Sequence, residues 1–166
     1  DPRLFAFSHE LGHTLGLGHA NAIDCKNKQI SKIESCIQYV YHDPTDVLGI
    51  NGTFHFNAPH KMLVDWLADI QIKTVNTSGI YNIDKLETQT QNIQLLKIPI
   101  PYTAEYYYIS YRQPLGFDEK LLEGVTSGVN IHIFPSYILG GDSTPLLIDA
   151  HPNTVAESSY SEFYDA

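Results

Sequence analysis

The spacing of hydrophobic positions changes near residue 69, and this change divides the chain into two kinds of predicted structure. Residues 57–70 place apolar side chains three and four positions apart, which predicts a helix with one face in the core. The members of this stripe are Met62, Leu63, Trp66, Leu67 and Ile70. Asn57 is suited to cap the start of this helix, and Pro59 is suited to its first turn.

Beyond residue 69, short apolar stretches are separated by turn residues, which predicts strands. The predicted strands are residues 71–75, 79–86, 92–98, 104–111, 128–134 and 145–148. They indicate an antiparallel, sandwich-like β module packed against the helix of residues 57–70, with a short helix at most near residues 118–122. Residues 16–55 show no clear period and are expected to be rich in loops. The predicted fold class is α+β, with one domain over residues 1–68 and a β-rich module over residues 69–166.

Residues 9–19 carry three histidines and a glutamate at the spacing of a zinc-hydrolase motif. The stretch reads His-Glu-Leu-Gly-His-Thr-Leu-Gly-Leu-Gly-His and fits the pattern H-E-x-x-H-x-x-G-x-x-H. A helix is expected from Pro2, with Asp1 as its cap, to about Leu15. On this helix the first two histidines lie one turn apart on one face, so both imidazoles can reach one ion.

The other residues of the motif supply a base, a turn and a third ligand. Glu10 points about 100° around the helix from His9, where it can hold a water beside the metal and take its proton. Gly16 tolerates the positive φ that ends a helix, so the chain can turn and bring back His19. Three neutral imidazoles leave one position open for water, which indicates one catalytic zinc ion held by His9, His13 and His19.

A His-Glu-x-x-His segment can also be an ordinary helix with polar residues facing solvent. The glycine and the third histidine in register favour the zinc site instead. His42 could serve as a fourth ligand, but catalytic sites keep an open position, so a polar loop histidine is the favoured interpretation. The remaining histidines lack ligand spacing and are expected to be solvated or hydrogen-bonded; they are His55, His60, His132 and His151.

Charge and composition narrow the classes of partner. The formal net charge of −9 argues against nucleic acid, because phosphate binding needs clustered lysine and arginine. The sequence has no run approaching the roughly 18 continuous apolar residues of a membrane helix. We therefore expect neither a nucleic-acid partner nor a membrane span in this chain, and composition does not indicate an oligomeric state.

The two cysteines bear on the cellular compartment. Cys25 and Cys36 flank a short polar segment after the third histidine. One even pair in a loop-rich region favours a disulfide, which is typical of an oxidising compartment, with two free thiols as the alternative. Asn51 and Asn76 begin N-glycosylation sequences, which also occur by chance. Together these features favour an extracellular, secreted or cell-surface location.

The chain resembles the gametolysin (autolysin) family of metzincin zinc peptidases, which includes algal cell-wall proteases. The resemblance rests on residues 9–20, the pair Cys25 and Cys36, and residues 41–49 and 56–67, with weaker similarity at 111–118 and 146–152. It implies that residues 1–68 form the C-terminal part of a metzincin-like catalytic domain: zinc helix, loop-rich segment and C-terminal helix. Metzincins have a methionine in the turn under the metal. Here Leu48 stands in its place, a nearly volume-conserving replacement, and Ile50 stands where astacin-like metzincins have a tyrosine ligand.

The motif and the resemblance together predict a zinc-dependent metalloendopeptidase. Its substrates are expected to be proteins or glycoproteins of the extracellular matrix or cell wall. The alternatives are a catalytically inactive surface or secreted binding protein that retains the zinc site, and a zinc hydrolase with a non-peptide substrate. Metzincins place a sheet before the zinc helix. We therefore expect residues 1–166 to be an internal part of a longer protein, truncated within the β module, with little activity when expressed alone.

Overall fold

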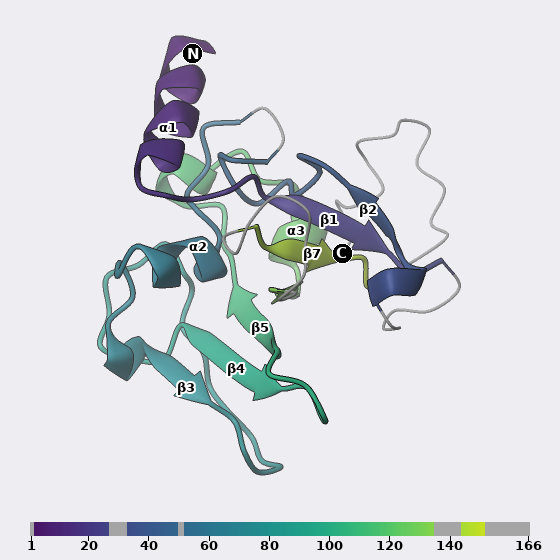
Figure 1. The fold of residues 1–166 in the computed structure, drawn as a ribbon. Helices are drawn as coiled ribbons and strands as arrows, with labels where there is room; N and C mark the ends of the chain where they lie inside the picture. Colours follow the sequence, from purple (N-terminus) through teal and green to yellow (C-terminus); the bar gives the residue numbers. More distant parts are fainter. Residues whose placement is uncertain (1, 27–32, 50–51, 135–143, 152–166) are drawn as a thin grey trace.

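The protein has a mixed α+β fold, with one seven-stranded sheet and few helices (Figure 1). The structure is a computed structural model, and it describes residues 2–26, 33–49, 52–134 and 144–151. The helix α1 (Pro2–Thr14) stands at one end of the molecule, outside the sheet, and the chain runs from it into β1 (Figure 1). The α+β class predicted from the sequence is confirmed at this level. Asp1, expected as the cap of α1, lies outside the described residues.

The sheet is mixed. Its strands are β1 (Asn21–Asp24), β2 (Ile37–Tyr39), β3 (Ile72–Thr74), β4 (Leu95–Pro99), β5 (Tyr106–Tyr111), β6 (Val129–Ile133) and β7 (Leu146–Ile148), in the order β2-β1-β7-β6-β5-β4-β3. The pairs β1·β7 and β3·β4 are parallel, and the other pairs are antiparallel. The prediction of an antiparallel, sandwich-like module was therefore wrong for the described residues. Alternating side chains identify a strand but do not set the direction of its neighbour.

Strands from both predicted domains belong to this one sheet. β1 lies within residues 1–68, and β7 pairs with it in the register Asn21↔Leu146 to Ile23↔Ile148. Strands from before and after residue 69 therefore share one sheet, and the domain boundary proposed at that residue stays a prediction.

Residues 79–86 do not form the predicted strand. A single bridge joins Lys85 to Tyr111. Backbone bonds from Asp84 N–H to Ile93 O and from Leu86 N–H to Tyr111 O hold the end of this segment, at 2.7 and 2.9 Å. The side-chain amide of Gln94 adds to them by donating to Lys85 O at 2.7 Å and to Thr88 O at 2.8 Å. A buried glutamine thus supplies part of the backbone pairing of this segment, and alternation in the sequence gives no sign of such a partner.

β1 and β2 form an antiparallel pair inside the segment predicted to be rich in loops. Three of the four residues of β1 are buried, so its sequence shows none of the alternation that would reveal a strand. Cys25 follows β1 and Cys36 precedes β2, and the two form a disulfide with their Cα atoms 4.2 Å apart. The predicted bridge is confirmed, and it ties the ends of the two strands together.

The helix α2 (Ala58–Leu63) begins as predicted and ends early. The side chain of Asn57 caps it by accepting the His60 N–H at 2.9 Å. Asp65 then adopts a left-handed conformation with φ of +56°. Two backbone bonds close this end in a Schellman arrangement: Asp65 N–H to Met62 O and Trp66 N–H to Lys61 O, at 3.2 and 2.8 Å.

The apolar stripe predicted for residues 57–70 is therefore not one helical face. Leu67 is buried, but the exposed fractions of Trp66 and Ile70 are 56 % and 61 %. The prediction was wrong here because the left-handed residue after α2 turns the chain before the stripe is complete.

The other helices are short. They are α3 (Glu123–Thr126) and the 3₁₀ turns η1 (Ile33–Ser35), η2 (Asp69–Gln71) and η3 (Gly116–Asp118). The short helix suggested for residues 118–122 is absent, and η3 and α3 lie on either side of it. In the described part of the chain, every helix is too short or too polar to cross a bilayer.

We predict that replacing both Cys25 and Cys36 with serine lowers the free energy of unfolding by about 3 kcal/mol, because a short loop is no longer closed in the unfolded chain. Denaturant unfolding of the variant and of the oxidised wild type measures the loss. Non-reducing peptide mapping is the control. Two thiols that react with an alkylating agent in the wild type would contradict the bridge.

Candidate metal centre

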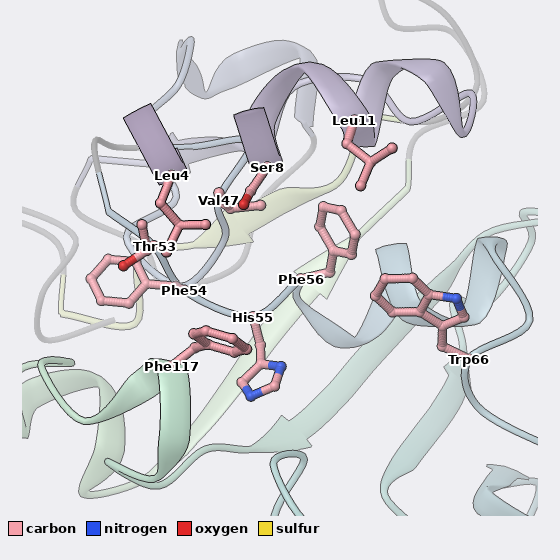
Figure 2. A pocket seen from close by; sticks show the side chains of 10 residues that line it. All are labelled: Leu4, Ser8, Leu11, Val47, Thr53, Phe54, His55, Phe56, Trp66 and Phe117. Atoms are coloured by element: carbon pink, nitrogen blue, oxygen red, sulfur yellow. The ribbon is translucent and has the colours of Figure 1, made fainter. Parts of the chain in front are cut away.

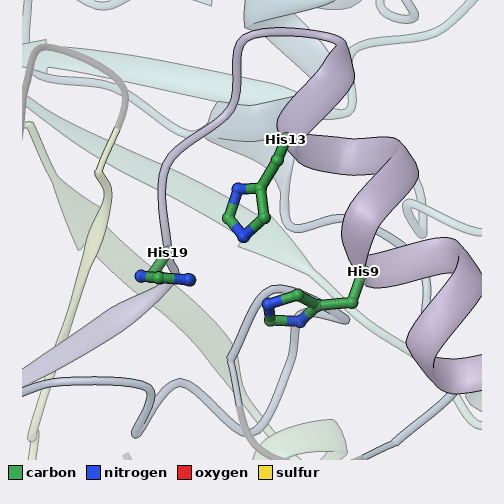
Figure 3. A group of neighbouring side chains, drawn as sticks. All are labelled: His9, His13 and His19. Carbon is green, nitrogen blue, oxygen red and sulfur yellow. The ribbon is translucent and has the colours of Figure 1, made fainter.

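Three imidazoles meet where α1 ends and β1 begins (Figure 3). His9 and His13 lie one turn apart on α1. Gly16 has a φ of +86°, and the bonds Gly16 N–H to His13 O and Leu17 N–H to Gly12 O close the helix in a Schellman arrangement. The chain then turns back and places His19 just before β1. Gly16 thus has the conformation expected of it at the helix-ending turn.

The ligand atoms of His9, His13 and His19 all lie within 4.8 Å of one another. Zinc–nitrogen bonds of about 2.1 Å in a tetrahedral site put the nitrogens about 3.4 Å apart, so small side-chain adjustments are enough to close the site on an ion. Among the described residues, this is the one group of three or more metal-binding side chains that converge. The donor set therefore fits zinc, and it would fit other metals that bind imidazole.

Backbone carbonyls fix two of the three rings. The Nδ1–H of His9 donates to Val47 O at 2.9 Å, and the Nδ1–H of His13 donates to Leu17 O at 2.9 Å. A carbonyl only accepts, so each Nδ1 carries the proton and each Nε2 keeps its lone pair. Histidines that bind metals are commonly oriented by such a bond from the second ring nitrogen. Two of the rings are therefore held in the tautomer that leaves Nε2 free to bind a metal.

His19 is disposed to remain neutral. Burial lowers the pKa of its imidazole, and the neighbouring His13 and His9 lower it further, while Glu10 acts in the opposite direction. A neutral imidazole is the form that binds a metal. The Tyr41 ring lies against His19, with ring centroids 4.0 Å apart.

Glu10 is exposed on α1, one position after His9. Its charge raises the pKa of His19, against the larger effects of burial and the other two histidines. The arrangement supplies three nitrogen donors and an adjacent carboxylate that solvent can reach. Chemically, this is the set needed to bind a metal ion and to accept a proton beside it.

Leu48 lies beneath α1 and is fully buried. A Cβ atom built on Gly12 would come within 2.9 Å of Leu48 Cδ2, so glycine allows the helix to rest directly on this side chain. Residues 43–49, called the 43–49 turn below, carry Leu48 and also the carbonyl of Val47 that orients His9. The turn thus contacts the helix both through the packing of Leu48 against Gly12 and through the hydrogen bond between Val47 and His9.

The 43–49 turn is surrounded by buried polar residues that sequence reasoning did not connect with the site. Asp46 Oδ2 accepts from the Nδ1–H of His60 at 2.7 Å, and Asp43 Oδ2 accepts from the Nε2–H of His132 at 2.9 Å. Both histidines were expected to be either solvated or hydrogen-bonded, and both are buried and hydrogen-bonded. The spacing of His132 in the sequence gives no sign of its partner, which lies on a different element.

Tyr41 is a second residue that the sequence did not single out. Its φ is +64°, an uncommon conformation for a residue other than glycine, and its backbone N–H donates to Asn21 Oδ1 at 2.8 Å. His42 lies outside the three-histidine group, and its Nδ1–H donates to Val40 O at 2.6 Å. Residues in such uncommon backbone conformations are often found at functional sites.

The structure describes one of the two predicted N-glycosylation sites. Asn76 is exposed, as modification requires. Asn51 and Ile50 lie outside the described residues.

An apolar pocket lies on another face of α1 (Figure 2). Leu4, Ser8 and Leu11 line it from the helix, and Phe54 and Trp66 line it from the opposite side. At 3.6 residues per turn, the helix residues of the pocket point about 100° to 160° away from His9. The pocket therefore does not belong to the metal cluster.

We predict that Gly12→Ala lowers the free energy of unfolding by about 1–3 kcal/mol, because the new methyl group overlaps Leu48. Leu48→Val alone is expected to cost about 1 kcal/mol through lost packing. The double variant should lose less than the sum of the two, because the smaller side chain leaves room for the methyl group. Denaturant unfolding of all four proteins tests this, and strictly additive losses would contradict the contact.

Comparisons of the chain with protein-family models, with curated proteins and with solved structures found no match. The chemistry of the site has to be inferred from the three imidazoles and the groups around them.

Proposed function

We propose that the protein is a zinc-dependent metalloendopeptidase. The observation that carries this proposal is the convergence of His9, His13 and His19, two of them with Nδ1 fixed on a carbonyl so that Nε2 is left for a metal. Zinc bound to three imidazoles would supply Lewis-acid catalysis by polarising a substrate carbonyl. The resemblance to the gametolysin family favours zinc among the metals that imidazole binds.

Glu10 is proposed as the general base. It follows His9 on α1 and is exposed, so an attacking water could reach its carboxylate. There it would take a proton from the water and later pass that proton to the amine that leaves when the peptide bond breaks. The charge of Glu10 acts on His19, which supports a position beside the cluster.

Proteins or glycoproteins of the extracellular matrix or cell wall are proposed as substrates, on the basis of the family resemblance. The Cys25–Cys36 disulfide supports a secreted or cell-surface protein, because such bridges persist in oxidising compartments. The net charge of −9 leaves nucleic acid an unfavourable partner.

We predict that Glu10→Gln in the natural full-length protein keeps one zinc per chain and lowers kcat/KM for an unfolded protein substrate by at least about 100-fold, because the base is lost and the ligands remain. Elemental analysis and a cleavage assay measure the two quantities. Glu123→Gln is the matched control, because Glu123 is an exposed glutamate at the start of α3.

The possible outcomes separate the candidate functions. Full activity of Glu10→Gln would contradict the role of the base. A wild type that binds zinc and cleaves no protein would favour the inactive binding protein or a hydrolase of another substrate. Activity that survives removal of the metal by a chelator would contradict metal-dependent catalysis.

A further inference from the structure

The 43–49 turn includes no helix or strand, and side chains hold its shape. Asp43 and Asp46 are fully buried, and each accepts a hydrogen bond from a backbone N–H two positions on, at 2.8 and 2.6 Å. Asn57 binds both carboxylates, with its side-chain NH₂ 2.9 Å from Asp43 and its backbone N–H 2.7 Å from Asp46. These two carboxylates therefore form a large part of the contact between the turn and the rest of the protein.

His132 holds one of these carboxylates from the sheet. It lies in β6 with an exposed fraction of 1 %, and its Nε2–H donates to Asp43 Oδ2 at 2.9 Å. In the part of the chain that the structure describes, its Nδ1 has no hydrogen-bond partner. The ring therefore makes its side-chain hydrogen bond through one nitrogen, and that bond goes to Asp43.

The Asp43 carboxylate depends on its partners. Burial by itself raises its pKa, yet the charge and hydrogen bond of His132, with hydrogen bonds from Thr45 and Asn57, lower the pKa to about 2. The group is therefore ionised at neutral pH in a site without water contact. A buried carboxylate that loses a partner moves, takes up a proton or destabilises the fold.

Two metal ligands rest on the same turn. Val47 O orients His9 through its Nδ1–H. Ala20, directly after His19, exchanges two backbone hydrogen bonds with the turn, at 3.0 and 3.4 Å. A shift of the turn would therefore move both the acceptor that orients one ring and the backbone that carries another.

We propose that His132 is a positioning residue of the metal centre. It holds Asp43 in place from the sheet, and Asp43 holds the turn on which His9 and His19 rest. This inference depends on the proposed zinc binding and adds to it a residue far outside the metal motif. A histidine that served the fold alone would change stability without changing the zinc affinity of the folded protein.

The test compares two amides at position 132 in the natural full-length protein. The side-chain nitrogen of His132→Gln can take the place of Nε2 and still donate to Asp43. His132→Asn is one bond shorter and leaves the carboxylate without this donor. Ile133→Ala is the matched control, because Ile133 is the next residue of β6, is 2 % exposed and packs with Cys25 in a cluster that does not include Asp43.

Zinc affinity is measured by competition with a chromophoric chelator, at a temperature where circular dichroism shows each variant to be folded. We expect His132→Asn to bind zinc about tenfold more weakly than the wild type and His132→Gln to stay within about threefold, by analogy with the removal of other groups that support metal ligands. Ile133→Ala should unfold more easily and keep its zinc affinity. Unchanged affinity in His132→Asn, or an equal loss in Ile133→Ala, would overturn the positioning role.

A second measurement does not depend on the folding of His132→Asn. Asp43→Asn is expected to weaken zinc binding by a similar factor and to alter the visible spectrum of bound Co²⁺. An unchanged zinc affinity and an unchanged Co²⁺ spectrum in Asp43→Asn would overturn the claim that His132 acts through Asp43. A wild type without zinc binding would overturn the proposed function and this inference with it, whereas a wild type that binds zinc while the variants also bind it normally would overturn this inference alone.

Discussion

A buried carboxylate needs hydrogen-bond donors or an opposite charge from the protein around it, because water cannot reach it. The 43–49 turn contains two such carboxylates. Asp43 and Asp46 are fully buried, and their hydrogen bonds come from two histidine side chains, from Asn57 and from groups of the turn itself. Arg112, which is also buried, donates to the carbonyl of Thr45 from the loop after β5. Removing any one of these donors would leave charge or polarity unsatisfied in the interior, which costs far more than an exposed contact gains. These buried hydrogen bonds therefore hold the turn in one conformation, and the three-histidine cluster contacts the turn through His9 and Ala20.

The local parts of this design could be predicted from the sequence. The spacing of residues 9–19 predicted a helix, a turn at Gly16 and three histidines close together, and the structure brings those histidines together. Capping by Asn57 and the disulfide were also predicted correctly. Each of these depends on residues near one another in the chain, where helix periodicity and cap chemistry are enough.

The long-range parts could not be predicted. β1 is buried and too short to show a period, and its parallel pairing with β7 leaves no mark in the pattern of either strand. The apolar spacing of residues 57–70 favoured a longer helix, but the left-handed conformation of Asp65 ends α2 earlier. The contact between Asp43 and His132 likewise depends on the arrangement of separate elements, so a single sequence offers only an isolated buried histidine in a strand. Residues that are close in space without being close in sequence were those that local reasoning missed.

The place of β7 in the sheet has a consequence for the order in which the protein matures. β7 lies between β1 and β6, so the last described strand of the chain completes the sheet beside the strand that follows His19. During synthesis the three histidines emerge from the ribosome before β7. At ordinary rates of elongation, β7 follows roughly ten seconds later. Until then β1 has β2 as its neighbour in the sheet and an open second edge. The three-histidine cluster is thus encoded near one end of the described chain, and the sheet beside it is completed from the other end. A nascent chain without β7 carries the three histidines but not the complete sheet.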